Sequence, residues 1–124
     1  MKKILFFFLL VTGTSIFAQD TDAPVLKLES DTVNYGTIAR GSDKTRKVKF
    51  TNAGKSPLII VHCDGSCSCT VGSCPHDPIQ PGQSSEITVV YNTDLVGRFH
   101  KTITIKSNNA GGNIYLHVVG TVTP

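Results

Sequence analysis

Apolar and polar residues alternate along short stretches of this 124-residue chain, and this period of two constrains the fold more than any other feature. In the stretch 45–51, Val48 and Phe50 fall on one face, while Lys47 and Lys49 fall on the other. Successive side chains of a strand point to opposite faces, so this alternation predicts a half-buried strand. No stretch of eleven residues shows the 3.6-residue period of a helix. The sequence therefore predicts an all-β protein.

Further strands are predicted along the chain, and clusters of Gly, Pro, Asn and Ser separate them. The predicted strands are 25–29, 32–38, 45–51, 58–61, 85–91, 99–106 and 113–122. The stretch 58–61 reads Leu-Ile-Ile-Val and is apolar on both faces, so it is predicted to be a central strand. The predicted inward side chains are Ile87, Val89, Tyr91, Phe99, Ile103, Ile105, Ile114, Leu116 and Val118. Short strands with regular turns are typical of an antiparallel β-sandwich, here with seven to eight strands.

The N-terminus has the organisation of a secretory signal peptide. Two lysines precede an apolar run at 4–11, and Ala18 precedes a chain that turns hydrophilic. The run is far shorter than the roughly 20 residues that span a bilayer, so we expect cleavage after Ala18 and no membrane span. Residues 1–18 are thus predicted to be a signal peptide, and residues 19–124 one exported domain, periplasmic or extracellular.

Little positive charge remains on the predicted mature domain. Removal of Lys2 and Lys3 with the signal peptide lowers the formal net charge from +3 to +1. The remaining basic cluster, at 44–49, alternates along a predicted strand and is expected to form a solvated face. Charge therefore gives no support to nucleic-acid binding.

All the cysteines of the chain lie in the segment 61–76. This segment contains Cys63, Cys67, Cys69 and Cys74, flanked by His62 and His76. An even number of cysteines in a short exported chain is typical of disulfides, because the compartment is oxidising. On a strand, Cys67 and Cys69 would face the same side, and each is expected to bond across to Cys63 or Cys74 rather than to the other. Two structural disulfides are the leading interpretation.

Two other chemistries would use the same residues. The thiolates of Cys63, Cys67, Cys69 and Cys74 and the imidazoles of His62 and His76 are ligands for zinc or copper, so a Cu or Zn site is the alternative. The mature chain offers no thioether ligand, since the one methionine is Met1. Thiol–disulfide exchange is a third hypothesis, with His62 as a cation beside a thiolate, although no thioredoxin-like strand–helix pattern accompanies it. Under the disulfide interpretation no cofactor is expected.

Three short motifs follow one another in a fixed order along the chain. They are Tyr-Gly-Thr-Ile at 35–38, Phe-Thr-Asn-Ala-Gly-Lys-Ser-Pro-Leu at 50–58 and Ser-Cys-Ser-Cys-Thr at 66–70. Their order resembles a bacterial family of secreted immunoglobulin-like domains of unknown function, whose third motif is Ser-Cys-Gly-Cys-Thr. Ser68 replaces the glycine of that signature, and Cys63 and Cys74 lie outside it. The resemblance implies an immunoglobulin-like sandwich related to abnormal-spindle and major-sperm-protein domains, which serve as interaction modules, and it implies no catalytic residues.

The sequence contains no recognisable catalytic motif. It has no Gly-x-Ser-x-Gly elbow and no phosphate-binding loop, and His100 and His117 lie at outward strand positions where exposed imidazoles are expected. We therefore expect a non-enzymatic interaction or structural module with a disulfide-stabilised Cys-rich loop. Its partner would be another protein or a cell-envelope component, bound at a sheet edge or at the loops of one end. The sequence leaves the oligomeric state open.

Overall fold

The computed structural model describes residues 22–124, and the predicted signal peptide at 1–18 lies outside this range. The described chain forms eight strands. They are β1 (Leu26–Leu28), β2 (Thr32–Ala39), β3 (Thr45–Asn52), β4 (Ile60–Gly65), β5 (Thr70–Ser73), β6 (Ser84–Tyr91), β7 (Gly97–Ser107) and β8 (Ile114–Thr123). Within 22–124, no helix is long and apolar enough to cross a membrane.

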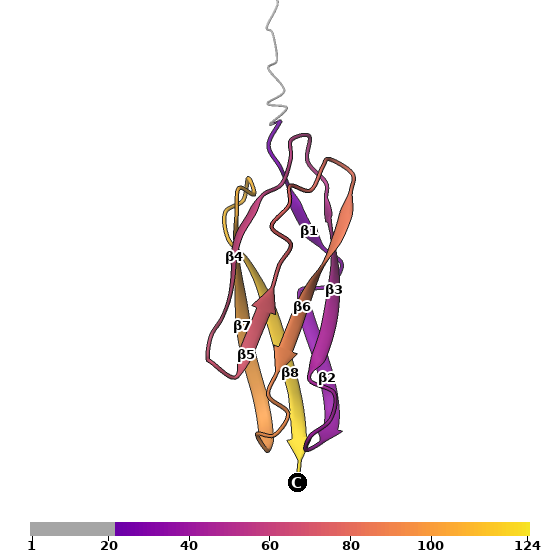
Figure 1. The fold of residues 1–124 in the computed structure, drawn as a ribbon, viewed down its shortest axis with the longest axis vertical. Helices are drawn as coiled ribbons and strands as arrows, with labels where there is room; N and C mark the ends of the chain where they lie inside the picture. Colours follow the sequence, from indigo (N-terminus) through magenta and orange to yellow (C-terminus); the bar gives the residue numbers. More distant parts are fainter. Residues whose placement is uncertain (1–21) are drawn as a thin grey trace, which may run out of the picture.

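The strands form two four-stranded sheets that pack as the layers of an elongated sandwich (Figure 1). One sheet has the order β1-β3-β6-β5, and the other has the order β2-β8-β7-β4. This confirms the predicted all-β sandwich. The pairing is antiparallel except between β2 and β8, which run parallel from Thr32 beside His117 to Ala39 beside Thr123. The sequence did not predict this parallel pair, because local alternation does not specify which strands become neighbours.

The core lies between the two sheets, and the predicted inward faces supply most of it. Fully buried members include Ile87, Val89, Ile103, Ile105, Leu116 and Val118. At one end of the core, the rings of Tyr91 and Phe99 stack with centroids 3.8 Å apart, and Tyr35 meets both rings edge-on. Such aromatic pairs add stability beyond the apolar area that they bury. Ile114, which was predicted to point inward, is only partly buried and packs against the hydrophobic core.

The prediction that 58–61 forms a central strand is wrong. β4 begins only at Ile60 and is an edge strand, paired with β7 alone. Leu58 and Ile60 are buried, whereas Ile59 is 44% and Val61 54% exposed. The ladder is irregular between Ile60 and His62, so that Val61 is the extra residue of a bulge. Apolar residues on both faces of a strand therefore do not show that both faces are buried.

β5 was not predicted, because its four residues lie inside the cysteine segment. It reads Thr-Val-Gly-Ser and forms the edge of the other sheet, beside β6. The strand contains a glycine for a packing reason, since a Cβ at Gly72 would lie 3.0 Å from the Ile103 side chain and 3.3 Å from Cys63. β4 and β5 thus bring the edges of both sheets to one side of the sandwich.

Candidate functional site

The cysteines lie on and beside two consecutive strands, β4 and β5, that belong to different sheets. β4 pairs with β7, with Cys63 opposite Ile105, and β5 pairs with β6, with Thr70 opposite Tyr91. The connecting turn therefore crosses from the edge of one layer to the edge of the next. We call residues 60–74, which comprise β4, this turn, β5 and Cys74, the cysteine edge.

Cys63 and Cys74 form one disulfide across the cysteine edge. Their Cα atoms lie 6.0 Å apart, and the bond closes a loop with a sequence separation of 11. Both side chains are partly buried and pack against the core. Since Cys63 lies on β4 and Cys74 directly follows β5, this bond joins the edges of the two sheets.

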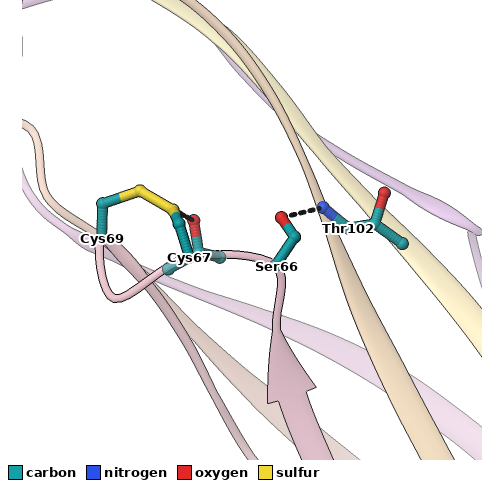
Figure 2. The surroundings of a disulfide bond; sticks show 5 residues. Ser66, Cys67, Cys69 and Thr102 are labelled. Carbon is teal, nitrogen blue, oxygen red and sulfur yellow. Dashed lines mark hydrogen bonds between the residues drawn. A yellow bond between two sulfur atoms is a disulfide. The ribbon is translucent and has the colours of Figure 1, made fainter.

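Cys67 and Cys69 form the second disulfide, and this differs from the expected pairing (Figure 2). The expectation placed both residues on a strand, from which each would reach across to Cys63 or Cys74. They lie instead in the turn between β4 and β5, where side chains do not alternate as they do on a strand. Their Cα atoms are 5.3 Å apart, within the usual range for a disulfide. No free cysteine remains in the described chain.

The turn is held in place by hydrogen bonds that do not involve the sulfur atoms. The main-chain N–H of Ser66 donates to the Thr102 carbonyl at 2.9 Å. The N–H of Thr102 in turn donates to the Ser66 hydroxyl at 3.1 Å (Figure 2). At its other end, the N–H of Thr70 donates to the Cys67 carbonyl, and the N–H of Asn92 donates to the Cys69 carbonyl. The turn is thereby fixed to β7 and to the segment after β6.

Thr70 places a buried hydroxyl between the two sulfur atoms of this disulfide. The residue is 2% exposed, and its Oγ1 lies 3.8 Å from Cys67 Sγ and 3.8 Å from Cys69 Sγ. A disulfide sulfur carries no hydrogen, so the single hydroxyl hydrogen of Thr70 is the donor that these two contacts share. Sequence reasoning did not single out Thr70, although it closes the Ser-Cys-Ser-Cys-Thr motif. The turn between β4 and β5 brings the Thr70 side chain into contact with both cysteines, and this contact makes the residue part of the site.

The residues of the predicted metal site do not gather around one point. His62 and His76 are exposed, His62 on β4 and His76 in the loop after Cys74. All four cysteines are in disulfides and offer no thiolate to a metal ion. Across residues 22–124, no three His, Cys, Asp or Glu side chains form a group that could hold a metal ion. This arrangement gives the Cu or Zn alternative no support.

Exposed apolar side chains accompany the disulfides at the cysteine edge. Val61 on β4 and Val71 on β5 are each 54% exposed, and Ile59, just before β4, is 44% exposed. Apart from β7, no strand in the described part of the chain pairs with β4. An edge strand directs every second set of N–H and C=O groups away from its partner, so β4 presents main-chain donors and acceptors together with these side chains.

The two other histidines contact each other on the outer face of the second sheet. His100 Nε2 lies 3.3 Å from His117 Nδ1, and the two rings meet edge-on. His100 is exposed, as predicted, whereas His117 is half-buried. A shallow groove of about 380 Å³ lies beside them, lined in part by Arg98, His100 and Thr121. It shares no residue with the cysteine edge.

Comparison with known families and structures places this geometry in context. Residues 26–122 match the family described as "Protein of unknown function (DUF1573)". A comparison with curated proteins found no match. A solved protein of unknown function from Porphyromonas gingivalis W83 superposes with a TM-score of 0.72 at 16% identity, over 79% of this chain and 46% of that one. The chain thus spans about half the length of that relative.

Two further solved structures share the fold at low identity. The ASH / PapD-like domain 7 of human CEP192 superposes with a TM-score of 0.67 at 6% identity, over 82% of this chain and 87% of that one. A chain of the CsuC–CsuE chaperone–tip adhesion subunit complex of Acinetobacter baumannii superposes with a TM-score of 0.59 at 10% identity, over 80% and 57%. These likenesses show an immunoglobulin-like, PapD-like sandwich.

Proposed function

The chain belongs to the DUF1573 family, whose function is unknown, and we propose that it is an exported, non-enzymatic module that binds an extended segment of another protein along the cysteine edge. The observation that carries this proposal is the pair of exposed valines, Val61 and Val71, on two adjacent edge strands. The partner is an exported or envelope protein with a segment that alternates apolar and polar residues.

The edge of β4 offers the two features that an added strand requires. Its outward main-chain groups supply hydrogen bonds for the backbone of a partner, and the exposed side chains of Ile59 and Val61, two positions apart, supply apolar contacts. In the described chain, the main-chain groups of residues 61–65 form no hydrogen bond with the main chain of a turn or loop. The affinity would come from the main-chain hydrogen bonds and the specificity from apolar contacts with Val61 and Val71.

The Cys63–Cys74 bond supports this role because it fixes the edge before a partner arrives. An edge strand held in one conformation loses less conformational entropy on binding than a flexible strand does. Binding at a rigid strand needs no catalytic group, which agrees with a non-enzymatic module.

The similar structures are consistent with an interaction role. One of them comes from a complex of a chaperone with a tip adhesion subunit, and another is an ASH / PapD-like domain. A relation to abnormal-spindle and major-sperm-protein sandwiches, and descent of Ser-Cys-Ser-Cys-Thr from a Ser-Cys-Gly-Cys-Thr signature, form part of this proposal.

Export is tested by the N-terminus of the protein recovered from its own cells. Cleavage after Ala18 gives a mature chain that starts at Gln19 in the envelope or culture fraction. The substitution Ala18→Leu places a large residue at the cleavage site and is expected to leave the precursor uncut. A wild-type protein that keeps Met1 and stays in the cytoplasmic fraction would contradict export.

Binding is tested by site-specific photo-crosslinking in the cells that produce the protein. A photoreactive residue at Val61 or Val71 is expected to give one discrete adduct, whose crosslinked peptide maps to a single extended segment of the partner. Leu95 and Tyr115, which are 46% and 53% exposed, are the matched controls away from the cysteine edge. An excess of unlabelled wild-type protein should abolish the adduct, whereas an excess of V61K/V71K should not. Equal adducts at Leu95 and Tyr115, or none at Val61 and Val71, would refute this binding mode.

A further inference from the structure

The two disulfides of the cysteine edge differ in the features that govern attack by an external thiol. Cys63 and Cys74 both pack against the core, and their bond joins two strands. Cys67 and Cys69 lie in a turn, with exposed Ser66 before Cys67 and exposed Ser68 between the two cysteines. Thiolate attack requires access to a sulfur atom, so the Cys67–Cys69 bond is the more accessible target.

The two sulfur atoms of the turn are also unequal. Cys69 packs against the core, whereas Cys67 is not part of that cluster. Exchange proceeds by attack on one sulfur, while the other departs as a thiolate. An incoming thiolate therefore reaches Cys67 Sγ more easily, and Cys69 becomes the leaving group.

Thr70 is placed to stabilise that leaving group. Its hydroxyl lies 3.8 Å from both sulfurs, and these are the hydrogen-bond partners that its oxygen has within residues 22–124. A disulfide sulfur is a weak acceptor, but a thiolate is charged, and a hydrogen bond to the charged form favours that form. The contact between Thr70 and Cys69 is thus stronger after the disulfide opens than before.

The turn would keep its shape once the sulfur–sulfur bond is broken. The bonds between Ser66 and Thr102, and those to the carbonyls of Cys67 and Cys69, all run through main-chain or hydroxyl groups. They hold the two cysteines near each other in the reduced state, and Cys63–Cys74 still joins β4 to β5. Reoxidation then needs no refolding, so the pair can cycle.

We propose that Cys67 and Cys69 form a reversible thiol–disulfide exchange site that takes a dithiol or two monothiols as its reducing substrate. A substrate thiolate attacks Cys67 Sγ, which forms a mixed disulfide and releases Cys69 as a thiolate beside the Thr70 hydroxyl. A second substrate thiolate attacks the substrate sulfur of the mixed disulfide and releases Cys67. The substrate leaves as a disulfide, and the protein retains two electrons and two protons as the Cys67 and Cys69 thiols.

This site would add thiol–disulfide exchange to the binding role proposed above, and it does not depend on that binding mode. Exchange uses the turn, whereas docking of a strand uses Val61 and Val71, and Cys67→Ser/Cys69→Ser leaves both valines in place. Loss of crosslinking at Val61 would therefore leave the exchange chemistry untouched. Loss of exchange would leave the crosslinks unchanged.

The wild-type protein, purified without reductant, provides the first test. It is incubated with reduced glutathione at neutral pH, quenched in acid, alkylated and mapped by mass spectrometry. Cys67 and Cys69 should become labelled at least about tenfold faster than Cys63 and Cys74 while the protein stays folded by circular dichroism. Free Cys67 and Cys69 thiols before treatment, simultaneous opening of both bonds, or earlier opening of Cys63–Cys74 would overturn the proposal.

The mixed disulfide shows which sulfur is attacked. In wild-type protein quenched early in the reaction with reduced glutathione, glutathione should be found on Cys67, with Cys69 free and alkylated. Equal amounts of glutathione on the two cysteines, or more on Cys69, would remove the assigned direction of attack. Cys67→Ser/Cys69→Ser is the control and should show no labelling in the turn.

Thr70 variants test the role of the hydroxyl. Thr70→Val keeps the shape but removes the donor, and should slow the opening of the Cys67–Cys69 bond by reduced glutathione about tenfold, which is the weight of a hydrogen bond to a charged group. Thr70→Ser restores the donor and should restore the rate. A folded Thr70→Val protein with an unchanged rate would exclude this role. If Thr70→Val does not fold, Thr70→Ser and the wild-type labelling experiment still decide whether exchange occurs.

Discussion

Cys63 on β4 of one sheet is bonded to Cys74 after β5 of the other, so that a covalent bond joins the edges of the two layers. A disulfide stabilises a protein mainly by restricting its unfolded chain, and the effect grows with the loop that it closes. The two disulfides of this chain close loops with sequence separations of 11 and 2. They should therefore contribute unequally to stability.

We predict that Cys63→Ser/Cys74→Ser lowers the free energy of unfolding by about 3 kcal/mol, because this bond closes the longer loop. Cys67→Ser/Cys69→Ser is the matched control and should cost only about 1.5 kcal/mol. Urea unfolding of both variants without reductant measures the difference. Equal losses would show that loop length does not govern the contribution of these bonds.

Asn52 provides a second prediction, because its buried amide connects three parts of the chain. Its Nδ2 donates to the carbonyls of Ser56 and Ile79, each at 2.8 Å, and its Oδ1 accepts from the N–H groups of Val25 and Gly54. Asn52→Ala leaves these main-chain groups without their partner and should cost about 3 kcal/mol or more. Thermal and urea unfolding check the loss. Asn34→Ala, which removes one exposed bond to the Gly36 N–H, should cost less than about 1 kcal/mol.

Gly120 provides a third prediction, since it lies directly opposite Phe99 in the ladder between β7 and β8. A Cβ at this position would lie 2.7 Å from Phe99 Cζ and 2.9 Å from Tyr35 Cβ. Gly120→Ala should displace the aromatic cluster and destabilise the fold by about 1–3 kcal/mol. A drop in the near-ultraviolet circular dichroism signal should accompany it. Gly111→Ala, whose Cβ would meet only the Asn109 side chain at 3.4 Å, should change stability by less than about 0.5 kcal/mol.

The buried phenol of Tyr35 leads to a prediction of how the stability of the fold depends on pH. Burial raises the pKa of Tyr35 above 10, and nearby Arg46 only partly opposes this; burial also raises the pKa of Tyr91. Between pH 10 and these raised values, the unfolded state loses the phenol protons first, so stability is complete below pH 10 and falls above it. Denaturant midpoints between pH 8 and 11 should show this fall.

Tyr35→Phe separates the two contributions of this side chain. It removes the hydrogen bond to the Lys44 carbonyl, so stability at pH 8 should fall by about 1 kcal/mol, and the decline above pH 10 should become shallower. Tyr115→Phe, at a 53% exposed position, is the control. A decline as steep as that of the wild type in Tyr35→Phe would show that Tyr35 does not cause it.

The strand pattern predicted those features of the fold that depend on local alternation. Ile87, Val89, Ile103 and Leu116 are buried as predicted, because a residue's side of a strand follows from its position along it. The order of strands and the parallel pairing of β2 with β8 depend on distant contacts that no local pattern contains. The stretch 58–61 shows the same limit, since its apolar residues are consistent with both a central and an edge strand.

The candidate site was predicted only in part. The cysteine segment was identified as a disulfide segment, but the pairing of Cys67 with Cys69 depends on a turn that the sequence pattern did not reveal. Thr70 was missed because a threonine after a cysteine is unremarkable until the turn places its hydroxyl beside two sulfur atoms.

The parallel pairing of β2 and β8 has a mechanical consequence. The described chain enters at one end of the sandwich and leaves at the other (Figure 1), and these two strands are registered at six positions from Thr32 to Ala39. A pull between the two ends would slide β2 and β8 lengthwise past each other once the short β1 had come away from β3. Hydrogen bonds loaded in this way share the force and must break together, so this pair of strands should resist a pull along the long axis of the domain.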